Sequence, residues 1–153
     1  MLSKQSKYGL RALVFLARHS HGRPVLISEI AQRENMPRKF LERILLDLKK
    51  RGVVKSKMGK GGGYELGRQP GQITVAEVIR ITDGPLAPVQ CVSETAYAKC
   101  TDCADEGTCC IRAVMKEVRD EIARILDHTT LADMLAKQQA LEAESRTGLA
   151  YQI

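Results

Sequence analysis

The chain has no tryptophan, and aromatic residues make up only 4% of it. Any core must therefore be built from aliphatic side chains. Unbroken apolar runs are only a few residues long, which excludes a transmembrane helix. The N-terminal sequence MLSKQSKYGL has neither the apolar segment nor the small-residue cleavage site of a signal peptide. These absences predict a soluble protein of the cytoplasm.

Groups that could carry out catalysis are also scarce. His19, His21 and His128 are the only histidines, and none is spaced to pair with a cysteine nucleophile. The glycine-rich stretch GKGGGY has Tyr64 where a dinucleotide fingerprint needs Gly, and Gly61 where a P-loop needs Ser or Thr. We therefore expect no enzymatic activity, and no small-molecule substrate is evident.

Positive charge is concentrated in the first half of the chain. Residues 1–70 contain 16 Lys and Arg against 5 Asp and Glu, a balance of +11. Residues 71–153 contain 8 against 13, a balance of −5. An ordinary solvated surface explains such an asymmetry less well than a polyanionic partner does, so we expect the first half to bind nucleic acid.

The first fifty residues predict three helices. Residues 6–20 have apolar side chains at helical spacing. Ser28 is expected to cap a short second helix, Asn35 to form a left-handed turn, and Pro37 to begin a third helix that stops at Gly52. A short helix, a turn and a longer helix with basic residues at its start are typical of a helix-turn-helix.

A β-hairpin is predicted directly after the third helix. The runs VVKSKM (53–58) and GYELG (63–67) flank the glycine-rich turn, and a hairpin at this place is a wing. Bare glycine backbone allows close approach to a phosphate, which we favour over a merely flexible tip. Residues 73–84 predict another helix, capped by Thr74 and stopped by Gly84.

The predicted fold class is mainly α with a small β-hairpin wing: a winged helix-turn-helix plus a long C-terminal dimerisation helix. Residues 1–84 form the expected DNA-binding domain and residues 85–110 a linker with a cysteine-rich metal or sensor loop. Residues 111–138 are expected to form the dimerisation helix and a short terminal helix, and residues 139–153 a flexible tail.

The late helix predicts self-association. Its apolar residues are spaced alternately by four and three, which indicates a coiled-coil-like seam. The seam comprises Ile111, Met115, Val118, Ile122 and Ile125, widened by Val114 and Leu126. The seam could pack on its own winged helix. However, a DNA-binding protein in which each chain recognises one half-site is usually a dimer, so we favour a homodimer.

The residues expected to contact double-stranded operator DNA lie on the third helix, the wing and the N-terminus. Arg38, Lys39 and Arg43 are the candidates for base and phosphate contacts in the major groove. Glu42 either accepts from a cytosine amino group or forms an ion pair along its own helix. The remaining candidates are Ser3, Lys4, Lys57, Lys60, Gly61, Gly62, Gly63 and Tyr64.

Every cysteine lies within residues 91–110. In a reducing cytosol, such a cluster more often binds metal or senses redox state than forms disulfides. Four of them, Cys91, Cys100, Cys103 and Cys109, match the ligand complement of a [2Fe–2S] or [4Fe–4S] cluster and equally that of structural zinc. Cys110 is surplus or a substitute for Cys109. A thiol–disulfide switch is less favoured, because Lys99 is the loop's only cation.

Three segments, YGLRALVFLA, ISEIAQRENMPRKFLERILLDLKKRGVVKSKMGKGGGYELGR and ITVAEVIRITDG, resemble the IscR/NsrR-type family of bacterial winged-helix regulators. The resemblance covers roughly residues 2–137, and the FLE and GGGY motifs are its most specific marks. It implies a homodimeric regulator, expected to be a repressor, that binds operator DNA. Many members carry an iron–sulfur cluster on this cysteine loop, and others work without one.

The sequence departs from the family in its cysteine spacing, since cluster-binding members typically have three cysteines about five residues apart and this chain has Cys91-x8-Cys100-x2-Cys103-x5-Cys109. It also departs at both fourth-ligand positions and in the wing. Some members use a histidine as fourth cluster ligand where this chain has Arg112, and others an acidic residue where it has Lys7. The wing has Met58 where relatives often have Arg. The resemblance favours an iron–sulfur cluster over zinc. The alternatives are a metal-binding structural or carrier protein with an incidental basic face, and a cluster-free regulator of cysteine metabolism.

Overall fold

The computed structural model describes residues 2–150, which form six α-helices and a two-stranded antiparallel hairpin. The predicted fold class is thereby confirmed. The elements in chain order are α1 (Lys4–His19), α2 (Ile27–Arg33), α3 (Arg38–Lys50), β1 (Val54–Lys57), β2 (Gly63–Leu66), the 3-10 turn η1 (Pro70–Gln72), α4 (Val75–Thr82), the 3-10 turn η2 (Gln90–Val92), α5 (Cys110–Asp127) and α6 (Leu131–Ala150).

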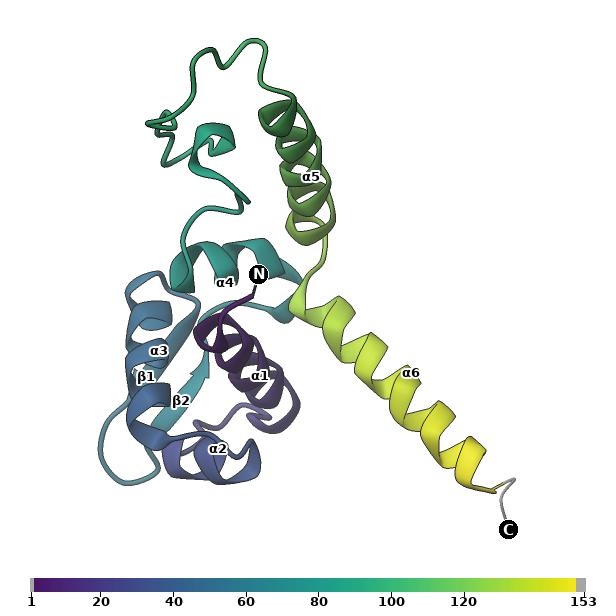
Figure 1. Cartoon of the computed structure of the whole chain (residues 1–153). Coiled ribbons are helices and arrows are strands. Elements are labelled where there is room, and N and C mark those ends of the chain that lie inside the picture. The colour runs from purple at the N-terminus through teal and green to yellow at the C-terminus, as the bar shows by residue number, and fades with distance from the viewer. Residues whose placement is uncertain (1, 151–153) are drawn as a thin grey trace.

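A single aliphatic core joins α1 to α4 and the hairpin (Figure 1). Helix α1 lies in the middle of this body and contacts α3, α4 and β2. The largest fully buried side chains are Leu13, Leu16, Ile30, Leu41, Ile44, Leu45, Leu48, Val53, Val54, Ile73, Val78 and Leu131. Because Leu131 is the first residue of α6, the start of the last helix is part of the same core.

The turn between α2 and α3 follows the sequence prediction, but the starts of both helices differ from it. Asn35 has a φ of +50°, the left-handed conformation expected. Helix α2 begins at Ile27, with no side-chain cap from Ser28. The reason is the preceding bridge between Val25 and β2, after which the chain turns directly into the helix. Pro37 is the N-cap of α3 rather than its first residue.

The hairpin is fixed to the body by a third extended segment. Val25 and Tyr64 exchange two backbone hydrogen bonds, with N···O distances of 2.7 Å in each direction. Gly63 has a φ of +142°, and a Cβ atom there would lie 2.4 Å from the Val25 carbonyl oxygen. Only glycine allows this close approach. The base of the wing is therefore held in place, and its tip projects beyond it.

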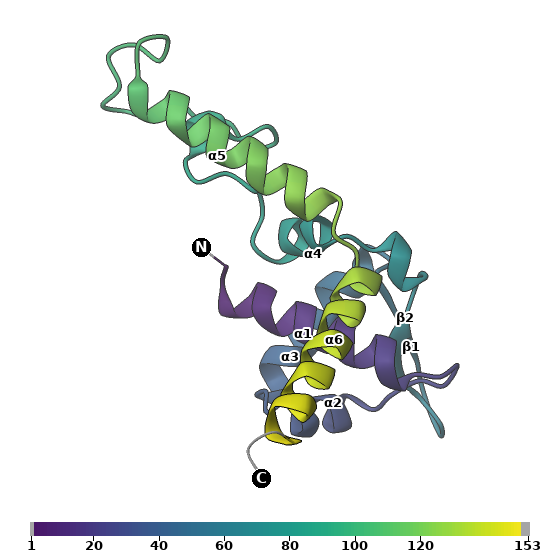
Figure 2. The same cartoon turned by 90° about the vertical axis from the view of Figure 1, so that its right-hand side faces the viewer.

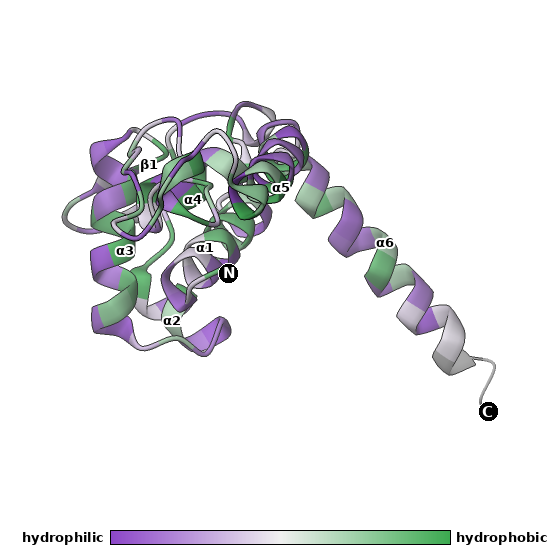
Figure 3. Ribbon diagram, turned by 45° about the horizontal axis from the view of Figure 1, so that its top comes forward, coloured by the Kyte–Doolittle hydropathy of each residue, from purple (hydrophilic) through white to green (hydrophobic). Residues whose placement is uncertain are grey.

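Helices α5 and α6 leave the body in different directions (Figures 1 and 2). The segment between α4 and α5 carries four of the five cysteines and lies beside α5, and Cys110 is the first residue of α5. Helix α6 passes along α1, where the guanidinium group of Arg18 binds the Glu142 carboxylate with an Nη1–Oε1 distance of 2.8 Å. Figure 3 shows hydrophilic and hydrophobic residues alternating along α6, without one continuous apolar stripe.

Helix α6 is much longer than the sequence analysis expected. A short helix ending near residue 138 and a flexible tail from residue 139 were predicted, but the helix continues to Ala150. The segment is rich in Ala, Leu, Gln and Glu and has no Gly before Gly148, so helix propensity carries it onward. The tail prediction for residues 151–153 concerns positions outside the described residues. Within residues 2–150, no helix has the length and apolar character needed to cross a membrane.

The buried face of α3 allows a direct test of the core. Replacing Leu45, which is fully buried, with Ala should lower the free energy of unfolding by about 2–5 kcal/mol, because it leaves a cavity. The next residue, Leu46, is 49% exposed, and Leu46→Ala should change stability by only about 0.5 kcal/mol. Urea denaturation of both variants measures the difference. Equal losses would show that α3 is not packed as described.

Candidate nucleic-acid interface and cysteine loop

Helix α3 presents a charged face to solvent. Arg38, Lys39, Glu42 and Arg43 are all exposed, while the opposite side of the helix is buried against the core. The Nε atom of Arg38 lies 3.1 Å from Oε1 of Glu42, an i, i+4 ion pair. This is the intrahelical pairing that was one of the two alternatives for Glu42. In Figure 1 both α3 and the loop of the hairpin lie at the edge of the body away from α6.

The predicted wing residues divide into an exposed tip and a fixed base. Lys57, Lys60 and Gly61 are exposed. Gly62 is buried in the turn, where its backbone N–H donates to the Gly59 carbonyl oxygen at 3.0 Å. Tyr64 packs against the core and pairs with Val25, so it belongs to the base of the wing.

At the N-terminus, Ser3 is engaged within the molecule. Its side chain accepts a hydrogen bond from the Ser6 backbone N–H at 3.1 Å and so caps α1. Its hydroxyl group donates to Asp83, which directly follows α4, and its backbone N–H donates to the same carboxylate at 3.1 Å. Lys4 is exposed. Figure 2 shows the N-terminus on the side away from the hairpin loop.

The cysteine side chains differ in their surroundings. Cys91 is buried in η2, which packs against α5, whereas Cys100 is exposed. Cys109 is half-buried and is the N-cap of α5, where its sulfur accepts from the Arg112 backbone N–H at 3.4 Å. Cys110 is the first residue of the helix and is exposed. The neighbouring Cys109 and Cys110 are therefore not equivalent, and Cys109 has the more defined position.

Two of the thiols have raised pKa values. Hydrogen bonding to Cys91 raises the pKa of the Cys100 thiol. Loss of hydration, followed by the charge and hydrogen bond of Cys109, raises the pKa of the Cys103 thiol. Raised thiol pKa values are the opposite of what a reactive thiolate needs.

The chemistry of this donor set fits a metal group. Four soft sulfur ligands suit an iron–sulfur cluster or zinc. In the part of the chain that the structure describes, no three His, Cys, Asp or Glu side chains are gathered closely enough to hold an ion. The fit therefore lies in the type and number of the ligands and not in their present arrangement.

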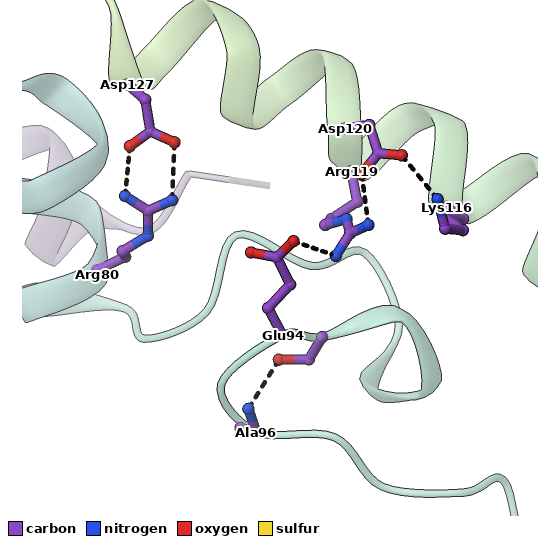
Figure 4. A network of polar contacts seen from close by, with 8 residues as sticks. Arg80, Glu94, Ala96, Lys116, Arg119, Asp120 and Asp127 are labelled. Carbon is purple, nitrogen blue, oxygen red and sulfur yellow. Dashed lines mark hydrogen bonds and ion pairs between the residues drawn. The ribbon is translucent and has the colours of Figure 1, made fainter.

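A polar network that the sequence analysis missed holds the cysteine loop and α5 in place (Figure 4). Arg119 of α5 has a side chain that is only 12% exposed, and its Nη1 lies 3.0 Å from Oε1 of Glu94 in the loop. It also binds Asp120 on its own helix. Nearby, Nε of Arg112 donates to the Cys91 carbonyl oxygen at 3.3 Å. Two arginines of α5 thus hold the loop.

A second contact fixes α5 to the winged-helix body. The Arg80 guanidinium group of α4 binds both carboxylate oxygens of Asp127, with an Nη2–Oδ2 distance of 3.0 Å (Figure 4). These hydrogen bonds lower the pKa of Asp127 below its ordinary value. The partners are 47 residues apart, so no spacing rule could have paired them.

The apolar seam of α5 is largely uncovered within the chain. Ile111 is 66%, Val114 53%, Val118 39% and Ile125 53% exposed, whereas Met115 and Ile122 are half-buried. No residue of α5 is fully buried. Only Leu126, near the end of the helix, packs against the core.

Comparison with known proteins identifies the family. Residues 2–137 match the family described as "Rrf2: Iron-dependent Transcriptional regulator". The chain belongs to the Rrf2 family of transcriptional regulators. It is 45% identical over 139 residues to an rrf2-like protein of Rhodobacter capsulatus, covering 89% of this chain and 93% of that protein.

Two solved Rrf2-type structures are similar in fold and sequence. The structure of CymR, the global cysteine regulator of B. subtilis, gives a TM-score of 0.74 at 32% identity and covers 90% of this chain and 97% of that one. The structure of IscR from T. potens gives a TM-score of 0.71 at 31% identity, with 90% and 88% covered. The expected resemblance is confirmed. So is the absence of an enzymatic role, since Rrf2 proteins are regulators that act on DNA.

Proposed function

We propose that this Rrf2 protein is a homodimer that binds operator DNA and whose DNA affinity is set by an iron–sulfur cluster on the cysteine loop. One observation carries the proposal. The loop lies between α4, which belongs to the body that presents α3 and the wing, and α5, whose apolar seam is uncovered. A conformational change in the loop therefore alters the connection between the DNA-binding body and the dimerisation helix α5.

The DNA contacts follow from the exposed residues. Lys39 and Arg43 on α3 bind phosphates and base edges in the major groove. Arg38 is oriented by its pair with Glu42, so this carboxylate positions a basic side chain on the reading face. Lys57 and Lys60 contact phosphates beside the helix, with the exposed backbone at Gly61 close to the duplex, whereas Gly62 is buried and Gly63 lies against Val25. Of the two N-terminal candidates, Lys4 is free for a phosphate, whereas Ser3 is held by Asp83.

The dimer rests on the seam of α5. The branched aliphatic side chains of this helix are between 39% and 66% exposed at Ile111, Val114, Val118 and Ile125. Such apolar surface is unfavourable in water unless a partner covers it. A second copy offers the same seam, and two-fold pairing of identical patches is the commonest closed assembly. Two recognition helices then face one duplex, as two half-sites require.

Cys91, Cys100, Cys103 and Cys109 are the proposed ligands of the cluster. When bound, the cluster supplies a redox-sensitive group that joins four distant points of the loop. Cys91 lies in η2, and Cys109 caps the first turn of α5. These two elements already contact each other. Cys110, exposed on the other side, is left free.

The arginine contacts connect the loop to α5 and α5 to the winged-helix body. Arg112 and Arg119 hold the loop to α5, and the Arg80–Asp127 pair holds α5 to α4. A loop that changes conformation therefore shifts α5 relative to the winged-helix body. In a dimer this alters the separation of the two recognition helices, and with it the operator affinity.

Salt dependence of DNA binding tests the regulator proposal. The full chain should select a duplex from a random-sequence library. Its affinity for that duplex should fall on the order of 10³-fold or more between 50 and 200 mM salt, because several phosphate contacts release counterions. Fluorescence anisotropy measures the fall. A protein that binds no duplex even at low salt is not an operator-binding regulator, and the carrier alternative would then replace the proposal.

The seam predicts a specific loss of self-association. Val118→Asp places a charge in the proposed interface and should convert the dimer to a monomer, since a buried unpaired carboxylate is strongly unfavourable. Sedimentation velocity measures the mass. Glu117→Ala, on the neighbouring exposed position of the same helix, is the matched control and should stay dimeric. A monomeric wild-type protein, or a dimeric Val118→Asp variant, would contradict the role of α5.

The ligand set predicts a difference between neighbouring cysteine variants. Anaerobically purified wild-type protein should contain iron and acid-labile sulfide, and Cys103→Ala should lose both while remaining dimeric. Cys110→Ala should keep wild-type amounts, because its side chain is not a proposed ligand. Metal and sulfide analysis per chain measures this. Zinc without sulfide would identify a structural zinc site instead, and unchanged iron in Cys103→Ala would rule out the assigned ligands.

A further inference from the structure

The tip of the wing carries very few side chains. Residues 58–63 read MGKGGG, so beyond the strands only Met58 and Lys60 extend past the backbone. The glycines are required by the turn rather than tolerated: a Cβ atom at Gly62 would lie 2.4 Å from the Lys57 carbonyl oxygen. Contacts made by the tip can therefore come only from backbone atoms, from Lys60 and from Met58.

The methionine is unusually open to solvent. Met58 is 91% exposed, more than any other large hydrophobic residue that the structure describes. It stands among polar and basic neighbours, away from the aliphatic core and away from the seam on α5. Neither folding nor the proposed dimer interface accounts for an apolar side chain at this place. Met58 directly follows the exposed Lys57 and lies two residues before the exposed Lys60, so it can reach the same partner as these basic residues.

We infer that Met58 makes an apolar contact in the minor groove of the operator, and that the wing thereby reads groove shape as well as phosphate charge. The inference rests on the proposed DNA-binding function. The walls of the minor groove are deoxyribose units, which offer apolar surface, and unbranched, flexible methionine adapts to irregular surfaces of this kind. Proteins that bind the minor groove do place apolar side chains in it, methionine among them, most often as wedges between base steps.

An apolar contact differs from an ionic one in its response to salt. Each lysine–phosphate contact contributes about 0.9 to the slope of log affinity against log salt, whereas an apolar contact contributes nothing to it. Met58 and Lys60 lie two residues apart on the same tip, so they form a matched pair. Removing the first should lower affinity at every salt concentration alike, and removing the second should also flatten the slope.

The experiment uses the full chain and the duplex that the wild-type protein selects from a random-sequence library. Met58→Ala should weaken binding about tenfold or more per dimer with an unchanged slope, since two apolar contacts are lost. Met58→Leu should bind within about threefold of wild type, because it keeps the apolar volume. Lys60→Ala should weaken binding and reduce the slope by about one per protomer. Leu141→Ala, at another exposed apolar position on α6, should leave binding unchanged.

The outcomes separate this inference from the proposed function. A wild-type protein that selects no duplex overturns both. A wild-type protein that binds, together with Met58→Ala of equal affinity or of reduced slope, overturns the Met58 contact alone. Hydroxyl-radical footprinting locates the contact, because the radicals attack deoxyribose in the minor groove. Met58→Ala should lose protection at the outer positions of the footprint, and unchanged protection there would also overturn the inference.

Discussion

Burial of one face of α3 against α1 and α4 is the interaction on which the rest of the structure depends. Leu41, Ile44, Leu45 and Leu48 are fully buried along one side of the helix. The helical repeat then leaves the charged residues no orientation except toward solvent. A rotation of α3 that exposed this apolar stripe would lose several kcal/mol per large side chain, roughly 1.5–3 each. The orientation of the charged face of α3 is therefore fixed by the core behind it.

The same core positions the two other functional parts. Val25 ties the hairpin to the body through its paired hydrogen bonds with Tyr64, so the tip of the wing has a defined place beside α3. On the other side, Leu131 anchors the start of α6 while Arg80 holds the end of α5. The cysteine loop therefore follows α4, which is part of the core, and leads into α5, which is held to the body by Leu126 and the Arg80–Asp127 pair at its far end.

The elements themselves were largely readable from the sequence, because local patterns determine them. Apolar spacing predicted α1, α3, α4 and α5, and the glycine-rich turn predicted the hairpin. The sequence analysis failed where tertiary contacts set the boundary. Helix α2 starts at Ile27 because Val25 is bridged to the hairpin, and Ser3 is engaged by Asp83, 80 residues away. The length of α6 was missed for a different reason: its helix propensity is high, but it lacks the amphipathic period that the prediction relied on.

The sequence by itself determined the helix-turn-helix, the wing, the excess of positive charge in the first half and the gathering of all five cysteines in one stretch, since each depends on residue type and short spacing. Only the tertiary structure decided which apolar residues of α5 stay uncovered, that Arg119 and Arg112 hold the loop, and that Met58 is left exposed at the tip of the wing. These features depend on which distant segments meet. Contacts across 21 to 80 residues leave no periodic signal in a single sequence.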